Sequence, residues 1–230
     1  MRHLRKFIPI LIIITVMILF YALGVNELIS WEVFKAHRES IKEFIAEHSI
    51  YSALIFMVIY AVLVALSVPI GFLLSMIGGF LFPQPLSILY VLIGATTGAS
   101  ILFLSAKTAL KDFFQKKVSK FFASMKEGFR KNSVTYLLLL RVLPLFPFWL
   151  VNIAPAFFNI SLRTYIWTTF VGIIPGVFVF TQAGRGIDMI FEGEGKIAFW
   201  DLLNTEMIIA MIGMIILAFI PMIVNNRKKK

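Results

Sequence analysis

Long apolar stretches constrain the fold of this chain more than any other feature. They fall at about 7–25, 50–82, 86–106, 134–158, 161–183 and 207–224. A helix that crosses the hydrocarbon core of a bilayer needs about 20 apolar residues. Charged residues make up 15% of the chain, whereas a typical soluble domain has about 25%. The sequence therefore predicts an all-α integral membrane protein.

The charges lie in the polar segments between these stretches, and their sign changes from one segment to the next. Lys and Arg dominate 1–6, 107–131 and the end of the chain, whereas acids outnumber bases in 26–49 and 184–206. Because cytoplasmic segments of membrane proteins are enriched in Lys and Arg, we expect both termini and 107–131 in the cytoplasm. The same bias explains the net charge of +10, so we predict no nucleic-acid partner.

This topology requires two apolar segments to return to the side from which they entered. Segment 50–82 is broken at S67-V-P-I-G71, and segment 134–158 is broken at L143-P-L-F-P147. Proline removes a backbone donor and clashes with the preceding turn, which favours a helical hairpin at each break. The predicted apex and structural residues are Pro69, Gly71, Pro144, Pro147 and Pro155. The alternative for the first hairpin is a plain spanning helix over 50–68, which would place the basic segment outside.

An internal repeat supports two hairpins that enter from opposite sides. A shift of 78 residues superimposes Pro69 on Pro147, and it superimposes one G-x-x-x-G pair on another. The sequence thus predicts about four spanning helices plus two oppositely oriented re-entrant hairpins in an inverted repeat. Small residues allow helix backbones to approach closely, and packing within the chain or dimerisation would both use them. The predicted packing residues are Gly78, Gly79, Gly94, Gly98, Gly172, Pro175 and Gly176.

The segments divide the chain into four regions. Residues 1–25 form an uncleaved membrane anchor helix, since their apolar stretch is longer than that of a usual signal peptide. Residues 26–49 form an external amphipathic helix, and 50–185 form the core. Residues 186–230 hold an external loop, the last membrane helix and a basic cytoplasmic tail. Within the core, the basic amphipathic helix 107–131 is expected to meet anionic lipid headgroups.

Two charged residues lie in the apolar stretches: Arg163, at the joint that precedes a spanning helix, and Arg141, the only one in the interior of a predicted membrane segment. It follows Asn132 by nine residues, which in a helix places it roughly 12–14 Å deep. Such a residue usually faces a partner or a cavity, and the membrane segments offer no acid. Neutral candidates are carbonyls freed by the prolines, Asn152, Thr168 and Thr169. An anionic lipid phosphate suits the guanidinium better; the alternative is a structural arginine that ties the broken hairpin together.

Signatures of catalysis and of metal binding are missing from the sequence. It has no nucleophile elbow, zinc-protease motif, Walker loop or dinucleotide fingerprint. It has no cysteine, which excludes thiolate metal ligands and disulfides. We therefore expect neither an enzyme nor a cofactor or metal.

Five motifs spread over roughly residues 45–185 point to one family. They are G78-G-F-L-F, I93-G-A-T-T-G-A-S-I-L-F-L-S-A-K107, R141-V-L-P-L-F-P-F, N152-I-A-P-A-F and G172-I-I-P. Together they resemble the VTT-domain membrane proteins, which form the DedA-like, SNARE-associated Golgi protein superfamily. The resemblance implies two opposed re-entrant hairpins and lipid movement. Eukaryotic members are described as phospholipid scramblases, and DedA-type bacterial members as translocators of undecaprenyl phosphate.

The chain also departs from the DedA pattern. Its first hairpin, around A65-L-S-V-P69, has no acid, and Pro147 stands where the second arginine of that pattern would be. The resemblance is closer to the Tvp-like branch, which makes proton coupling unexpected. Arg141 is the one charged site residue that the resemblance carries over.

Three candidate functions follow from the sequence. The leading hypothesis is a lipid translocase, scramblase- or flippase-like, in which Arg141 and Asn152 bind the phosphate of a phospholipid or polyprenyl phosphate. The alternatives are a non-transporting membrane scaffold for envelope proteins and a transporter of anions or small solutes. We expect a multi-pass protein of the bacterial plasma membrane. Its partners would be membrane lipids, and a homo-oligomer is compatible with the sequence.

Overall fold

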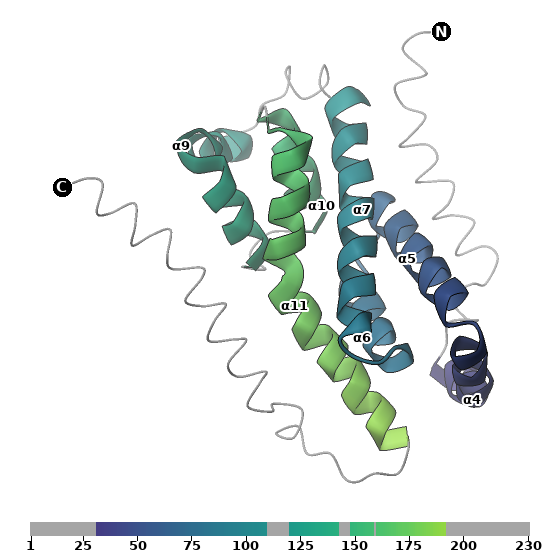
Figure 1. The fold of residues 1–230 in the computed structure, drawn as a ribbon. Coiled ribbons are helices and arrows are strands. Elements are labelled where there is room, and N and C mark those ends of the chain that lie inside the picture. The colour runs from purple at the N-terminus through teal and green to yellow at the C-terminus, as the bar shows by residue number, and fades with distance from the viewer. Residues whose placement is uncertain (1–30, 110–119, 143–147, 159, 192–230) are drawn as a thin grey trace, which may run out of the picture.

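The computed structural model of the 230-residue chain describes residues 31–109, 120–142, 148–158 and 160–191 (Figure 1). All regular structure in these ranges is helical. The elements are α4 (Trp31–Glu47), α5 (Ser49–Ala65), α6 (Gly71–Leu81), α7 (Leu86–Ala109), α9 (Lys120–Val142), α10 (Phe148–Ile153), the 3₁₀ turn η1 (Ala154–Phe157) and α11 (Leu162–Phe191). The predicted membrane helices 7–25 and 207–224 and the hairpin apex 143–147 lie outside the described residues.

Helices α7 and α11 form the centre of the molecule and run side by side in opposite directions (Figure 1). Both are long and apolar enough to cross a membrane, over Leu86–Thr108 and Leu162–Met189. The two glycines of the first G-x-x-x-G pair face α5. A Cβ on Gly98 would lie 2.3 Å from the Ala61 carbonyl oxygen, and one on Gly94 would lie 2.9 Å from the Tyr60 Cβ. Close approach of α5 and α7 therefore depends on these glycines.

Helices α5 and α6 form a pair whose outer ends lie at the same end of α7 (Figure 1). The break between them falls at residues 66–70, where the sequence predicts it, and Ser67 there has a positive φ of 62°. The backbone around the break is satisfied internally. The Val68 N–H donates to the Leu63 carbonyl, and the Tyr60 hydroxyl donates to the Gly71 carbonyl at 2.9 Å. Such internal pairing is what an interruption at membrane depth requires.

Helix α9 consists of two parts that meet at Asn132. This residue is extended (φ −159°, ψ 92°), and its side-chain oxygen accepts a hydrogen bond from the Thr135 N–H at 3.1 Å. Asn132 thus caps the second part, as short polar residues do at helix starts. The break separates the basic segment from the apolar stretch that contains Arg141. After the undescribed residues 143–147 the chain continues as α10 and η1.

Helix α11 is longer than the sequence predicts. The apolar pattern predicts an end at 183 and an external loop from 186, but α11 continues to Phe191. Two contacts explain the extension. A Cβ on Gly184 would lie 1.9 Å from the Met76 carbonyl oxygen on α6, and Asp188 pairs with two cations on α4. Hydropathy alone does not detect either contact, so it places the end of the helix too early.

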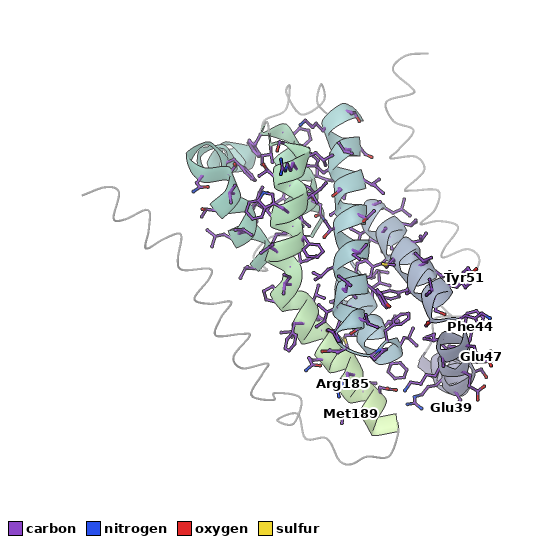
Figure 2. All side chains as sticks on the ribbon, in the orientation of Figure 1. Glu39, Phe44, Glu47, Tyr51, Arg185 and Met189 are labelled. Atoms are coloured by element: carbon purple, nitrogen blue, oxygen red, sulfur yellow. The ribbon has the colours of Figure 1, made fainter. Side chains whose placement is uncertain are left out.

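Helix α4 turns by 113° from α5, so that it lies across the lower end of the bundle in Figure 1. Its polar side chains collect there together with those near the end of α11, as the labels of Glu39, Glu47 and Arg185 show in Figure 2. The first turn of α11, with Arg163, lies at the opposite end (Figure 1). The described bundle therefore has two polar ends separated by an apolar middle.

Candidate functional site

Arg141 lies in the last turn of α9 and faces α10 and α11. Its Nη1 donates to the Asn152 Oδ1 at 2.6 Å. Its Nη2 donates to the Tyr165 hydroxyl at 2.8 Å and to the Thr169 hydroxyl at 3.0 Å. These four residues, which we call the Arg141 cluster, connect both limbs of the second apolar segment to α11. None of them is acidic.

The cluster is packed as tightly as a protein core. Asn152 and Tyr165 are fully buried, and Thr169 is 1% exposed. The Tyr165 ring stacks on Phe103 of α7 with a centroid distance of 4.3 Å. The Arg141 guanidinium carbon lies over the same Tyr165 ring, 5.3 Å from its centroid. Cation–π attraction and the hydroxyl bond thus hold the guanidinium in one orientation.

Gly172 allows Arg141 to approach α11 so closely. A Cβ at this position would lie 2.8 Å from the Arg141 Cβ and 3.1 Å from its Cγ. Any larger residue would push the arginine stem away from the helix. Gly172 was expected to serve helix packing, and the structure places it beneath the candidate functional side chain.

Two donors in the cluster have no partner among the described residues. The Arg141 Nε and the Asn152 Nδ2 are both buried and form no hydrogen bond there. A buried donor without a partner costs about 1–3 kcal/mol, and more when it belongs to a charged group. No carboxylate in the described ranges pairs with Arg141. The cluster therefore has unused capacity for an acceptor, and its charge favours an anionic one.

Positions along helix α11 show how far the Arg141 cluster lies from the two polar ends of the bundle. Arg163 and Arg185 are 22 residues apart on this helix, which corresponds to about 33 Å and matches a hydrocarbon core of about 30 Å. Gly172, which contacts Arg141, lies about 14 Å from the Arg163 level and about 20 Å from the Arg185 level. Arg141 is thus held near the middle of the apolar belt.

The other predicted site residues serve the backbone around the cluster or lie apart from it. Pro69 is exposed at the first break, and the Gly71 carbonyl there accepts the Tyr60 hydroxyl. Pro155 is buried in η1, and α11 continues through Pro175. Pro144 and Pro147 lie outside the described residues.

The predicted packing glycines differ in their surroundings. A Cβ on Gly78 would lie 2.9 Å from Phe56 and from Val91, and one on Gly79 would lie 1.9 Å from the Thr181 carbonyl oxygen. Gly176 has no described atom within 4 Å of such a Cβ. The second G-x-x-x-G pair is therefore unlike the first, because only Gly172 makes a close contact.

Sequence reasoning missed two parts of the arrangement. Tyr165 was not proposed as a partner of Arg141, although it lies in the first turn of α11. Thr168 was proposed, but its hydroxyl bonds the Thr164 carbonyl at 2.7 Å. The second omission is the ion-pair cluster at the far end of α11, where Asp188 binds Arg38 at 2.7 Å and Lys42 at 2.6 Å.

Arg38 is buried on α4, and it stays charged. Burial alone would lower its pKa, but the hydrogen bond and charge of Asp188, together with Glu39, raise that pKa above the ordinary value. Asp188 therefore keeps a permanent cationic partner, which fixes α4 to α11.

With this geometry established, comparisons with known sequences identify the family. Residues 68–186, more than half of the chain, match the family model of the VTT domain. The chain belongs to the VTT-domain family. The prediction from the sequence motifs is thereby confirmed. The matched residues run from the start of α6 into α11 and include all four residues of the Arg141 cluster.

Several transmembrane protein 41 sequences are similar to this VTT-domain chain. The homolog of Caenorhabditis elegans is 27% identical over 175 residues, 75% of this chain and 69% of that protein. The Dictyostelium discoideum homolog is 28% identical over 178 residues, 76% of this chain and 51% of that protein. Transmembrane protein 41B of Homo sapiens is 27% identical over 175 residues, 74% of this chain and 58% of that protein. The chain thus spans half to about two thirds of their length.

No solved structure matches the chain at a significant level. The relatives are named as transmembrane proteins, and α7 and α11 have the length and composition of membrane spans. The chain is therefore a membrane protein of the VTT-domain family. The likeness to the Tvp-like branch stays a prediction, because these relatives are transmembrane protein 41 sequences.

Proposed function

We propose that this VTT-domain protein is a lipid translocase in which the Arg141 cluster binds the phosphate of a phospholipid or polyprenyl phosphate as the headgroup passes the apolar middle. The observation that supports this proposal most is a half-buried guanidinium whose partners among the described residues are all neutral. A permanent cation at this depth is stabilised by a counter-ion. A lipid phosphate supplies such a counter-ion, whereas no carboxylate in the described ranges pairs with Arg141.

The unused donors define how such a phosphate would bind. The Arg141 Nε–H and the Asn152 Nδ2–H lie in the same cluster and form no hydrogen bond to described residues. Phosphate oxygens accept several hydrogen bonds at once, and charge-assisted ones are about twice as strong as neutral ones. Asn152 is held by Arg141 and by the Tyr165 hydroxyl, at 2.6 and 3.1 Å. Its amide is thus oriented before a ligand arrives.

The pairs α5–α6 and α9–α10 act in this proposal as two re-entrant hairpins that enter from opposite sides and form an inverted repeat. The α5–α6 pair turns back within the length of α7 (Figure 1). Interrupted helices let polar groups face a path without exposing unpaired backbone to lipid. In the proposed orientation, in a bacterial plasma membrane, Lys107 and Arg163 mark the cytoplasmic end and α4 marks the external end. The basic segment 107–131 then meets anionic headgroups.

A flux assay tests the proposal. The full chain is reconstituted into liposomes that contain fluorescent phospholipids or a fluorescent polyprenyl phosphate, and dithionite quenching reports the lipid that reaches the outer leaflet. Wild type is expected to accelerate exchange over protein-free liposomes. Arg141→Gln keeps a polar side chain but removes the charge, and should slow exchange roughly 10- to 100-fold, as expected for the loss of a charge-assisted interaction.

The matched control is Arg163→Gln, which removes the same charge from an exposed position on α11. It should exchange lipids at the wild-type rate. If wild type moves each lipid at the protein-free rate, or if Arg141→Gln is as fast as wild type, the proposal is wrong. Failure for lipids with measurable flux of small anions would favour a solute transporter, and stoichiometric co-purifying proteins without flux would favour a scaffold.

A further inference from the structure

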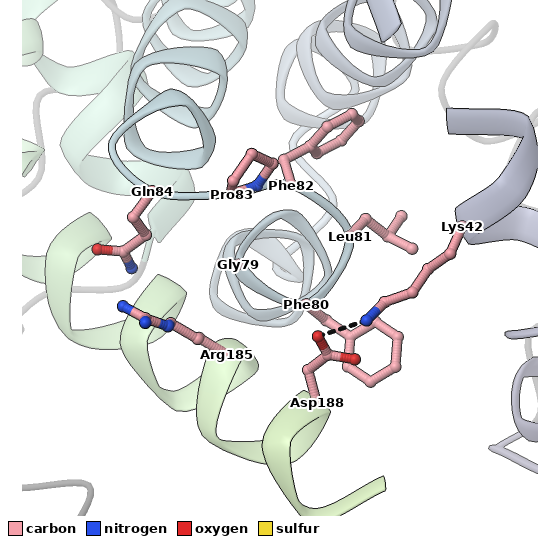
Figure 3. A pocket seen from close by; sticks show the side chains of 9 residues that line it. All are labelled: Lys42, Gly79, Phe80, Leu81, Phe82, Pro83, Gln84, Arg185 and Asp188. Carbon is pink, nitrogen blue, oxygen red and sulfur yellow. Dashed lines mark hydrogen bonds and ion pairs between the residues drawn. The ribbon is translucent and has the colours of Figure 1, made fainter. Parts of the chain in front are cut away.

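A pocket of about 330 Å³ lies at the end of α11 that is remote from the Arg141 cluster (Figure 3). Ligand sites usually occupy about 300–1,000 Å³, so this one suits a small group. Its walls come from the carboxyl end of α6, the joint to α7, the end of α11 and one side chain of α4. The lining residues are Lys42, Gly79, Phe80, Leu81, Phe82, Pro83, Gln84, Arg185 and Asp188.

The charges around this pocket do not cancel. Asp188 is the only acid in its lining, and both of its oxygens are occupied. Oδ1 accepts hydrogen bonds from Arg38, and Oδ2 accepts one from Lys42. The lining therefore has two cations and one anion, a formal charge of +1.

Arg185 is the cation in the pocket lining that does not pair with Asp188. It is exposed, and no hydrogen bond or ion pair joins it to any other described residue. Figure 3 shows its guanidinium beside the Gln84 amide, on the side of α6 opposite the Lys42–Asp188 pair. Gln84 is itself held by the Thr181 hydroxyl at 3.3 Å. The pocket thus presents an unpaired guanidinium next to a positioned amide.

The position of the pocket restricts which anions it meets. Arg185 lies about 33 Å along α11 from Arg163, so the two arginines mark opposite faces of the apolar belt. Helices α5 and α6 have no charged residue, whereas α4, Arg185 and Asp188 form a polar layer at this end. In a membrane protein this layer lies at the level of the headgroups, where phosphate is the prevalent anion.

We propose that this pocket is a second anion site, which binds a phosphate group through Arg185, with Gln84 beside it as a neutral donor. The phosphate belongs to a lipid headgroup or is free in solution; both present the same oxygens to a guanidinium. The site rests on the pocket alone and does not require that lipid crosses the membrane. If lipid does cross, α11 carries two phosphate sites about 20 Å apart.

Hydrogen–deuterium exchange of the full chain in uncharged detergent tests this site locally. The probes are dioctanoyl phosphatidic acid, dioctanoylglycerol with the same chains but no phosphate, and sodium phosphate against sodium chloride at equal ionic strength. Phosphatidic acid is expected to slow exchange in peptides that cover 79–85 and 182–189, saturably. Protection by sodium phosphate as well would identify free phosphate as a ligand, and protection by phosphatidic acid alone would identify the headgroup.

Variants decide whether Arg185 holds the phosphate. Arg185→Gln should raise the half-saturating concentration about 10-fold or more, and Arg185→Lys should restore part of the binding. Arg163→Gln, at the other end of the same helix, should bind like wild type. The proposal is overturned if neither phosphate probe protects these peptides, if dioctanoylglycerol protects them equally, or if Arg185→Gln binds like wild type. None of these results depends on flux through the Arg141 cluster.

Discussion

Replacing Tyr165 by Phe removes a single oxygen atom from the centre of the Arg141 cluster. That oxygen accepts the Arg141 Nη2–H at 2.8 Å and donates to the Asn152 Oδ1 at 3.1 Å. Phe keeps the stacking on Phe103 but removes one of the two acceptors of the Arg141 Nη2, so that only the Thr169 hydroxyl at 3.0 Å remains. Hydrogen bonds to charged groups contribute about 1.5–3 kcal/mol. One kcal/mol shifts the midpoint by about 2–4 °C in a chain of this size, so we expect a loss of roughly 3–12 °C.

The assay heats the purified chain in detergent to a series of temperatures. Size-exclusion chromatography then measures how much folded protein remains at each temperature, which gives the midpoint of thermal unfolding. Tyr51→Phe is the matched control, because it deletes the same atom from a side chain that is 66% exposed on α5. Its midpoint should equal that of wild type. If Tyr165→Phe and Tyr51→Phe unfold at the same temperature, the hydroxyl does not support Arg141 and the geometry of the cluster is wrong.

Further predictions concern the contacts around the site. Gly79→Ala places a methyl group against the α11 backbone and should destabilise the fold by about 1–3 kcal/mol, as overpacking does. Gly176→Ala meets no described atom and gains helix propensity of up to about 1 kcal/mol, so its thermal midpoint should not fall. If both variants unfold alike, α6 and α11 do not cross as described. Asp188→Asn should speed hydrogen exchange throughout α4, since it leaves buried Arg38 without its main partner. Glu39→Gln, with a side chain 77% exposed, should change this exchange little; equal effects would contradict the ion-pair cluster.

Local chemistry made several features predictable from sequence. The break after α5 follows from Pro69, which lacks a backbone N–H and clashes with the preceding turn of a helix. Arg141 stood out because it is a permanent charge in an apolar stretch. Asn152 and Thr169 were among its expected partners, since only neutral hydrogen-bonding groups were within reach on neighbouring segments. The VTT-domain motifs added the family, which the domain match confirms.

Features that depend on distant contacts were not predictable. Tyr165 meets Arg141 because Gly172 brings α9 onto α11, and no local pattern encodes that approach. The extension of α11 to Phe191 depends on Gly184 against α6 and on Asp188 against α4, whose partners lie about 110 and 150 residues earlier in the chain. Hydropathy reports only how apolar a segment is. It therefore ended the helix at the last apolar run.

The proposed function requires that Arg141 contacts a lipid phosphate at the middle of the bundle. Dipolar recoupling between ¹⁵N-labelled arginine side chains and lipid ³¹P in frozen proteoliposomes measures this contact directly, as the difference between wild type and Arg141→Gln. If Arg141 binds the phosphate, the difference signal should correspond to a guanidinium nitrogen roughly 4 Å from phosphorus, the spacing of a charge-assisted hydrogen bond. Identical recoupling in wild type and Arg141→Gln, with Arg185 and the other interfacial arginines supplying all of the signal, would contradict it.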